Sequence, residues 1–147
     1  MSIAVKLCLT AAFVFFMTGL ITGVWKYVCM ARSPKAAAPR YVNVAHQSSL
    51  MYSFAAALLG WFASYSVFPD WLNTLSAAVA LLFFALAIGS YVLHGMLQDT
   101  SNQFRKPHQL GAWSLHPALM VFFMVVLIVA EVGGTAVLGV GALLAIW

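Results

Sequence analysis

The residues best suited to chemistry begin at Tyr41–Tyr52 (YVNVAHQSSLMY), which opens the second of four long apolar segments. His46 stands about one helical turn inside that segment. Polar residues recur around it at spacings that place them on one helix face: Asn43, His46, Ser49 and Ser53. Because an ionisable group inside a membrane span is costly, a functional role for His46 is the first hypothesis. Two readings stay open: a histidine near the membrane surface that bonds a carbonyl or serine, and a ligand to heme or a metal.

A second group of polar residues is expected at the same depth. Tyr91, His94 and Gln98 end the third apolar segment on one helix face, and His116 begins the fourth. A helix rises about 1.5 Å per residue, so three of the four histidines and Tyr91 are expected in one layer. This layer is where a site is predicted.

Glu131 is the only acid inside an apolar segment. Its helix face continues through mostly small residues, which permit close helix approach: Gly134, Thr135, Leu138, Gly141, Ala142 and Ala145. One interpretation is a protonated acid hydrogen-bonded across a tight helix contact. The other is a proton relay, which needs further ionisable groups at that depth, and the sequence pattern places none there.

Other reactive patterns find little support. Asp70 and Asp99 both lie in connections, so no Ser-His-Asp set is predicted. Cys8 and Cys29 would lie about 30 Å apart along one helix, which is too far for a disulfide. No glycine-rich phosphate loop or CxxC zinc pattern occurs.

The composition indicates a membrane protein of one domain, residues 1–147. The chain is 64% hydrophobic and only 7% charged, whereas soluble domains are roughly 25% charged. The net charge of +4 comes from basic residues between the apolar segments. We therefore expect the lipid bilayer as a partner and no nucleic acid.

Each apolar segment exceeds the roughly 20 residues that cross a bilayer as a helix. The N-terminal run Leu7–Met30 is also longer than the ~7–15-residue core of a signal peptide. Short connections force neighbouring helices to be antiparallel. The sequence thus predicts an all-α membrane protein, an antiparallel four-transmembrane-helix bundle, with spans near 4–30, 42–67, 73–98 and 113–146.

The connections set the expected orientation. Ala31–Arg40 and Asp99–Gly111 carry most of the basic residues, while the tight turn Phe68–Leu72 carries none. Basic loops stay in the cytoplasm. We expect both chain ends on the outer face of the membrane.

The order of these parts resembles that of small four-span bacterial membrane isomerases, the styrene oxide isomerases and the hydroxylaminobenzene mutases. An Ala-His pair opens the second span (Ala45–His46), and a Gly-x-Tyr closes the third (Gly89–Tyr91). An Asn-Gln-Phe run lies in the polar loop before the fourth (Asn102–Phe104). The resemblance covers most of the chain in architecture and few residues in identity.

The resemblance implies a homotrimer in the bacterial inner membrane. In it His46 would bind ferric heme b at a subunit interface. The iron would act as a Lewis acid on the oxygen of a small aromatic epoxide or N-hydroxyarylamine. Tyr91 would orient the substrate or stabilise the developing charge.

Two further residues complete the candidate site. Asn43, one turn before His46, is expected to accept a hydrogen bond from the other ring nitrogen and to help hold the cofactor. Tyr52 stands six residues after His46, where the family commonly has asparagine, and is the second candidate catalytic residue. Phe83 stands where the styrene oxide enzymes have an acid.

Two rival functions belong to other classes. A b-type electron-transfer cytochrome would need two histidines at equal depth on facing helices, for which His46 with His94 or His116 would serve. A cofactor-free accessory subunit would use its histidines only for hydrogen bonds.

Overall fold

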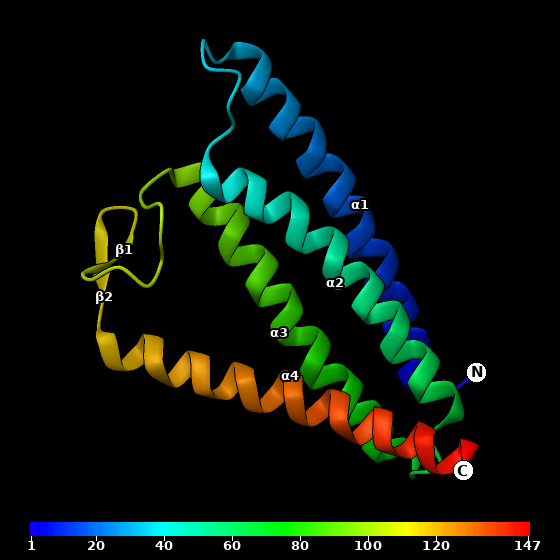
Figure 1. Cartoon of the computed structure of the whole chain (residues 1–147). Helices are drawn as coiled ribbons and strands as arrows, with labels where there is room; N and C mark the ends of the chain where they lie inside the picture. The colour runs from blue at the N-terminus through cyan, green and yellow to red at the C-terminus, as the bar shows by residue number, and fades with distance from the viewer.

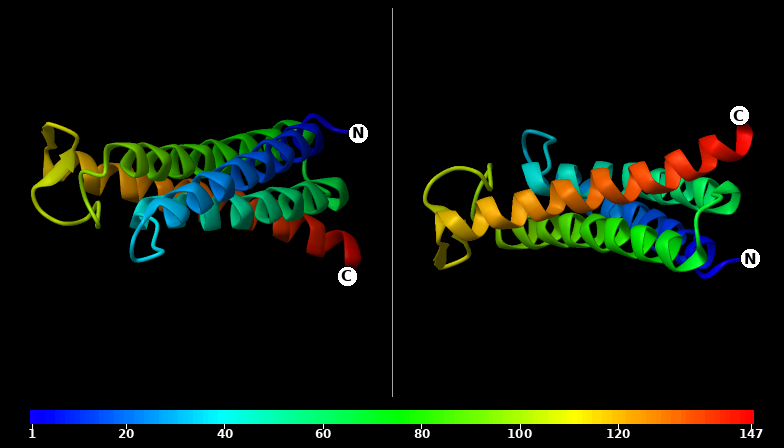
Figure 2. Two further views of the ribbon diagram at one scale, coloured as in Figure 1. Left: turned by 90° about the horizontal axis from the view of Figure 1, so that it is seen from above. Right: turned by 90° about the horizontal axis from the view of Figure 1, so that it is seen from below.

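The structure is a computed structural model that describes residues 1–147. Four long helices run alternately in opposite directions (Figure 1): α1 (Ile3–Arg32), α2 (Arg40–Tyr65), α3 (Asp70–Leu97) and α4 (Pro117–Ile146). Both termini lie at one end of the molecule, and the α1–α2 connection and the loop before α4 lie at the other (Figure 2). This arrangement matches the sidedness expected of the connections.

Three of the four helices, α1, α3 and α4, are long and apolar enough to cross a membrane. α2 has 26 residues but is less apolar, because its first half carries the polar face around His46. Large apolar side chains are exposed along the helices, for example Phe13, Phe54 and Phe122 at 66–69%. Such a surface is consistent with contact with a lipid bilayer.

One predicted boundary is wrong. The fourth segment was expected to be helical from residue 113, but α4 begins at Pro117. The preceding residues form a small antiparallel hairpin of β1 (His108–Leu110) and β2 (Trp113–Leu115). Gly111 makes its tight turn possible with a positive φ of 59°.

Small residues set the distances between helices. A Cβ on Gly19 of α1 would lie 2.6 Å from the Leu50 side chain of α2. On α4, a Cβ on Gly134 would meet the Ser76 carbonyl of α3, and one on Gly141 would meet Ser66 after α2. The small-residue face predicted for the fourth helix therefore packs against its neighbours.

α4 diverges from α3 toward the hairpin (Figure 1). The two helices pack closely near Gly134 and separate toward the start of α4, where the loop and hairpin connect their separated ends. This wedge brings α3, α4 and the hairpin around one cavity.

Candidate functional site

The imidazole of His46 is anchored to α1. Its Nδ1 atom lies 2.8 Å from the carbonyl oxygen of Gly19. A carbonyl oxygen can only accept, so a neutral His46 carries its proton on Nδ1 and donates it. Nε2 then keeps its lone pair, as a metal ligand requires.

Gly23 of α1 makes room for this ring, and Gly19 makes room for the neighbouring Leu50. A Cβ on Gly23 would lie 2.9 Å from Cε1 of His46, so the imidazole rests against a bare stretch of backbone. Gly19 and Gly23 form a GxxxG pair, the spacing that lets helices approach closely. Sequence reasoning missed both residues, although this spacing was the signal that could have found them.

The prediction that Asn43 accepts a hydrogen bond from His46 is wrong. Asn43 directs its amide nitrogen to the carbonyl of Ala38, at 3.4 Å, and Gly19 takes the predicted role. Asn43 lies in the first turn of α2, where the carbonyls of the preceding connection are its nearest acceptors. Ser49 donates within its own helix to the Ala45 carbonyl, at 2.7 Å.

The two candidate tyrosines lie between α2 and α3. The Tyr91 ring stacks on Tyr41 with centroids 6.2 Å apart, and Tyr52 stacks on Phe84 at 4.4 Å. Tyr91 thus faces the start of α2, whereas His46 faces α1. Within one chain the structure does not bring the two residues of the predicted heme site into contact.

Two tyrosines lie near Glu131, which the sequence pattern did not indicate. The carboxyl group lies within electrostatic range of both Tyr52 and Tyr91. Its Oε1 atom is buried and has no hydrogen-bond partner. The expected hydrogen bond of this oxygen across a helix contact is therefore not made, and the expectation that no ionisable group lies near Glu131 is wrong.

The predicted layer of histidines is only partly assembled. His94 lies beside Tyr41, with ring centroids 5.1 Å apart, and so joins Tyr41 and Tyr91. His116 is exposed and caps α4, where its Nδ1 accepts from the Ala118 N–H at 3.2 Å. His46 and His94 have different neighbours, so one iron bound by both within a chain is not supported.

His94 pairs with an acid that sequence reasoning set aside. Gln98 adopts a left-handed conformation that ends α3 and turns the chain back. Asp99 can then place Oδ1 2.8 Å from Nδ1 of His94, while Oδ2 accepts from the Gly111 N–H at 2.6 Å.

Both hydrogen bonds affect the ionisation of Asp99. Partial burial disfavours the charged carboxylate, but the bonds from Gly111 and His94 outweigh it and hold the pKa of Asp99 below its usual value. The ionised acid therefore fixes the loop against the end of α3.

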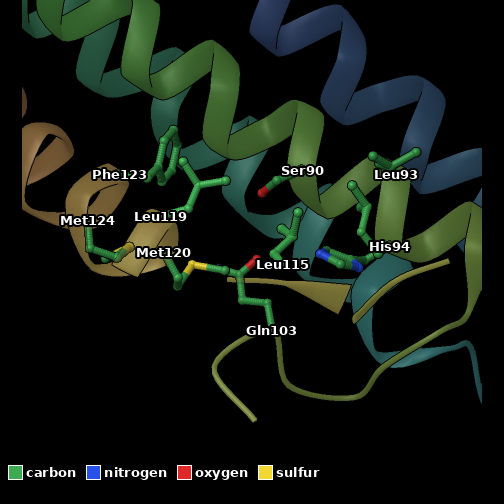
Figure 3. A pocket seen from close by; sticks show the side chains of 10 residues that line it. Ser90, Leu93, His94, Gln103, Leu115, Leu119, Met120, Phe123 and Met124 are labelled. Atoms are coloured by element: carbon green, nitrogen blue, oxygen red, sulfur yellow. The ribbon is translucent and has the colours of Figure 1, made fainter. Parts of the chain in front are cut away.

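This pair does not extend to a Ser-His-Asp set. Ser90, one turn before His94, donates its hydroxyl proton to the Ala87 carbonyl at 2.8 Å. His94 instead lines a cavity of about 320 Å³ between α3, α4 and the hairpin (Figure 3).

The residues present meet part of what a heme requires. In its neutral form His46 has the right tautomer and would offer Nε2 as a ligand to heme iron. None of the five principal cavities is lined by His46. No principal cavity of one chain would therefore enclose a porphyrin on this residue. No group of three or more His, Cys, Asp or Glu side chains converges as a metal cluster.

Comparisons with known proteins add no relative. No family model matches the chain, and neither do any curated proteins or solved structures.

Proposed function

We propose that this protein is a membrane-embedded isomerase, or mutase, that rearranges a small aromatic epoxide or N-hydroxyarylamine with a ferric heme b held by His46. The observation that carries the proposal is the hydrogen bond from Nδ1 of His46 to the Gly19 carbonyl. It fixes the ring orientation and the tautomer, and it raises the basicity of Nε2 as a ligand.

When bound, ferric heme supplies a Lewis acid that polarises a C–O or N–O bond without net oxidation. The chain supplies the surroundings. Tyr91 and Tyr52 each carry a neutral hydroxyl that can donate a hydrogen bond to a substrate oxygen. The exposed apolar side chains favour entry of a poorly soluble aromatic substrate from the bilayer. Exclusion of water would protect a cationic intermediate from hydrolysis.

The proposal places the heme between copies of the chain, in a homo-oligomer that we take to be a trimer. His46 lines none of the principal cavities. Tyr91 of α3 packs against Tyr41 at the start of α2, whereas His46 faces α1. Walls from a second subunit would enclose a porphyrin and could bring a tyrosine to it.

The proposal also requires α2 to cross the membrane as the fourth span. Its 26 residues correspond to about 39 Å of helix, which is enough for the hydrocarbon layer. Packing against α1 through Gly19 and Gly23 would shield the polar face around His46 from lipid. Following the resemblance, we propose a bacterial inner membrane as the location of the bundle.

The test is the heme content of the purified protein. We expect a Soret band and the EPR signal of five-coordinate, high-spin ferric iron in the wild type. His46→Ala should lose the heme, whereas His116→Ser should keep it, because His116 is exposed and serine preserves the helix cap.

The proposal is overturned if His46→Ala retains a full complement of heme. A six-coordinate low-spin spectrum would instead support a bis-histidine cytochrome. Wild-type protein without a Soret band, expressed with ample heme, would support the cofactor-free accessory subunit.

A further inference from the structure

The cavity between α3 and α4 has apolar walls and a few polar groups at its hairpin end. Its volume is about 320 Å³, about twice the ~150 Å³ that suffices for benzene in an engineered core. The walls come from all three elements (Figure 3): Leu93 of α3, Leu115 of β2, and Leu119, Met120 and Phe123 of α4. This space suits a molecule of one or two rings.

His94 presents one defined hydrogen-bonding atom to this cavity. Its Nδ1 donates to Asp99, because an ionised carboxylate can only accept. In the neutral imidazole Nε2 therefore carries a lone pair, and no group of the chain bonds to it. In Figure 3 the imidazole extends toward the cavity beside Leu115 and Ser90. A polar atom in an apolar cavity gains from a ligand that completes its hydrogen bond.

The network around His94 holds this tautomer in place. Asp99 is fixed at its other oxygen by the Gly111 N–H at 2.6 Å. Tyr41 packs on the His94 ring and accepts the Gln103 N–H at 2.6 Å, which ties the loop to α2. The Ser90 hydroxyl donates its hydrogen bond to the Ala87 carbonyl, so its oxygen lines the cavity as an acceptor.

We infer that this cavity is a binding site for a small aromatic molecule whose hydroxyl group donates a hydrogen bond to Nε2 of His94. The acceptor selects a hydroxyl over an ether or a hydrocarbon of the same shape. Leu93 and Leu119 line the cavity and are 41% and 54% exposed, so we expect the ligand to enter past them from the bilayer. The inference does not depend on heme binding at His46.

The test compares naphthol with its methyl ether, which has the same rings and no donor. Binding is measured by equilibrium dialysis against nanodiscs that contain the protein, after subtraction of the partition into empty nanodiscs. The hydroxyl should improve binding about three- to tenfold, the value of one net hydrogen bond.

Two variants tie the preference to His94. His94→Asn removes Nε2 but keeps an amide N–H that can reach Asp99, so the loop stays anchored and the preference for naphthol should vanish. His116→Ser, a histidine change outside the cavity, should leave the preference unchanged.

Asp99→Asn should reverse the hydrogen-bonding role of Nε2 of His94 from acceptor to donor. If its amide oxygen accepts from Gly111, its NH₂ group faces His94, and Nδ1 must become the acceptor. Nε2 then carries the proton and becomes a donor. The preference should shift toward acetophenone, which can only accept.

Equal binding of naphthol and its ether, or an unchanged preference in His94→Asn, would overturn the inference. If a lipid chain or a second copy of the protein fills the cavity instead, naphthol and its methyl ether should bind equally. Heme content is read from the Soret band of the same samples, so failure here is distinct from failure of the heme proposal.

Discussion

His46 and His94 are held in the same way at two places in the molecule. Each directs Nδ1 to a fixed oxygen, the Gly19 carbonyl in one case and the Asp99 carboxylate in the other. In its neutral form each therefore keeps the lone pair of Nε2. The difference lies in the surroundings, because His46 rests against the backbone of α1 and His94 borders an apolar cavity. We accordingly propose a ligand role for His46 and an acceptor role for His94.

Tyr91→Phe tests the proposed donor to the substrate oxygen. The variant should keep the heme, because the stacking on Tyr41 needs only the ring. Isomerase activity on an aryl epoxide or arylhydroxylamine should fall on the order of a hundredfold or more, as when one oxyanion donor is removed. Tyr65→Phe is the matched control, since Tyr65 is 53% exposed near the far end of α2. Full activity in Tyr91→Phe would remove Tyr91 from the site and leave Tyr52 to be tested.

The sequence indicates which residues are polar within the spans but not what they contact. The position of His46 on a polar helix face follows from spacing, whereas its partner Gly19 lies 27 residues away on another helix. The pairing of His94 with Asp99 depends on the left-handed Gln98, which a sequence pattern does not reveal. The spacing of polar residues specifies which helix face they share. Which residues they contact depends on how the neighbouring helix is rotated about its axis.

At the scale of elements, two glycines of α1 determine how closely α2 packs against it. Gly19 and Gly23 allow Leu50 and His46 to approach α1 more closely than any side chain would permit. The resulting contact also gives the His46 proton its acceptor. Close packing and the chemical state of the imidazole therefore have the same cause.

Gly23→Ala should disturb this contact. The new methyl group would lie 2.9 Å from the His46 ring, so the ring must move and the bond to Gly19 must weaken. We expect a loss of about 1–3 kcal/mol in stability and a lower heme content, measured by thermal unfolding in detergent and by the Soret band. Gly133→Ala, on an exposed face of α4 with nothing within 4 Å, is the control and should lose neither. Unchanged heme content in Gly23→Ala would show that the contact between Gly23 and His46 is not needed for cofactor binding.

The helices were easier to predict than the hairpin. Each helix is a long apolar run bounded by proline or polar residues, a pattern that survives in any packing. The strands have three residues each, which is too short for a periodic signal. The sequence predicts a helix at Trp113–Leu115 because this segment adjoins a longer apolar run. In the structure it pairs instead with His108–Leu110 across the Gly111 turn.

At the scale of the whole molecule, one chain has little interior. The buried core consists largely of small residues such as Ala56, Ala77 and Ala80, while large apolar side chains face outward. Lipid can cover such a surface, so exposure alone does not demand a partner. The need for a second subunit comes from the proposed cofactor, since no principal cavity adjoins His46.

Heme binding and assembly should therefore be coupled. Native mass spectrometry in mild detergent is expected to show three copies of the 15.9 kDa chain with bound heme. Because a heme shared between subunits favours only the assembled state, His46→Ala should lose the heme and shift the distribution toward monomer. His116→Ser should remain a heme-loaded trimer. A monomer that still holds one heme would show that a single chain encloses the cofactor, and the placement of the site between subunits would then be wrong.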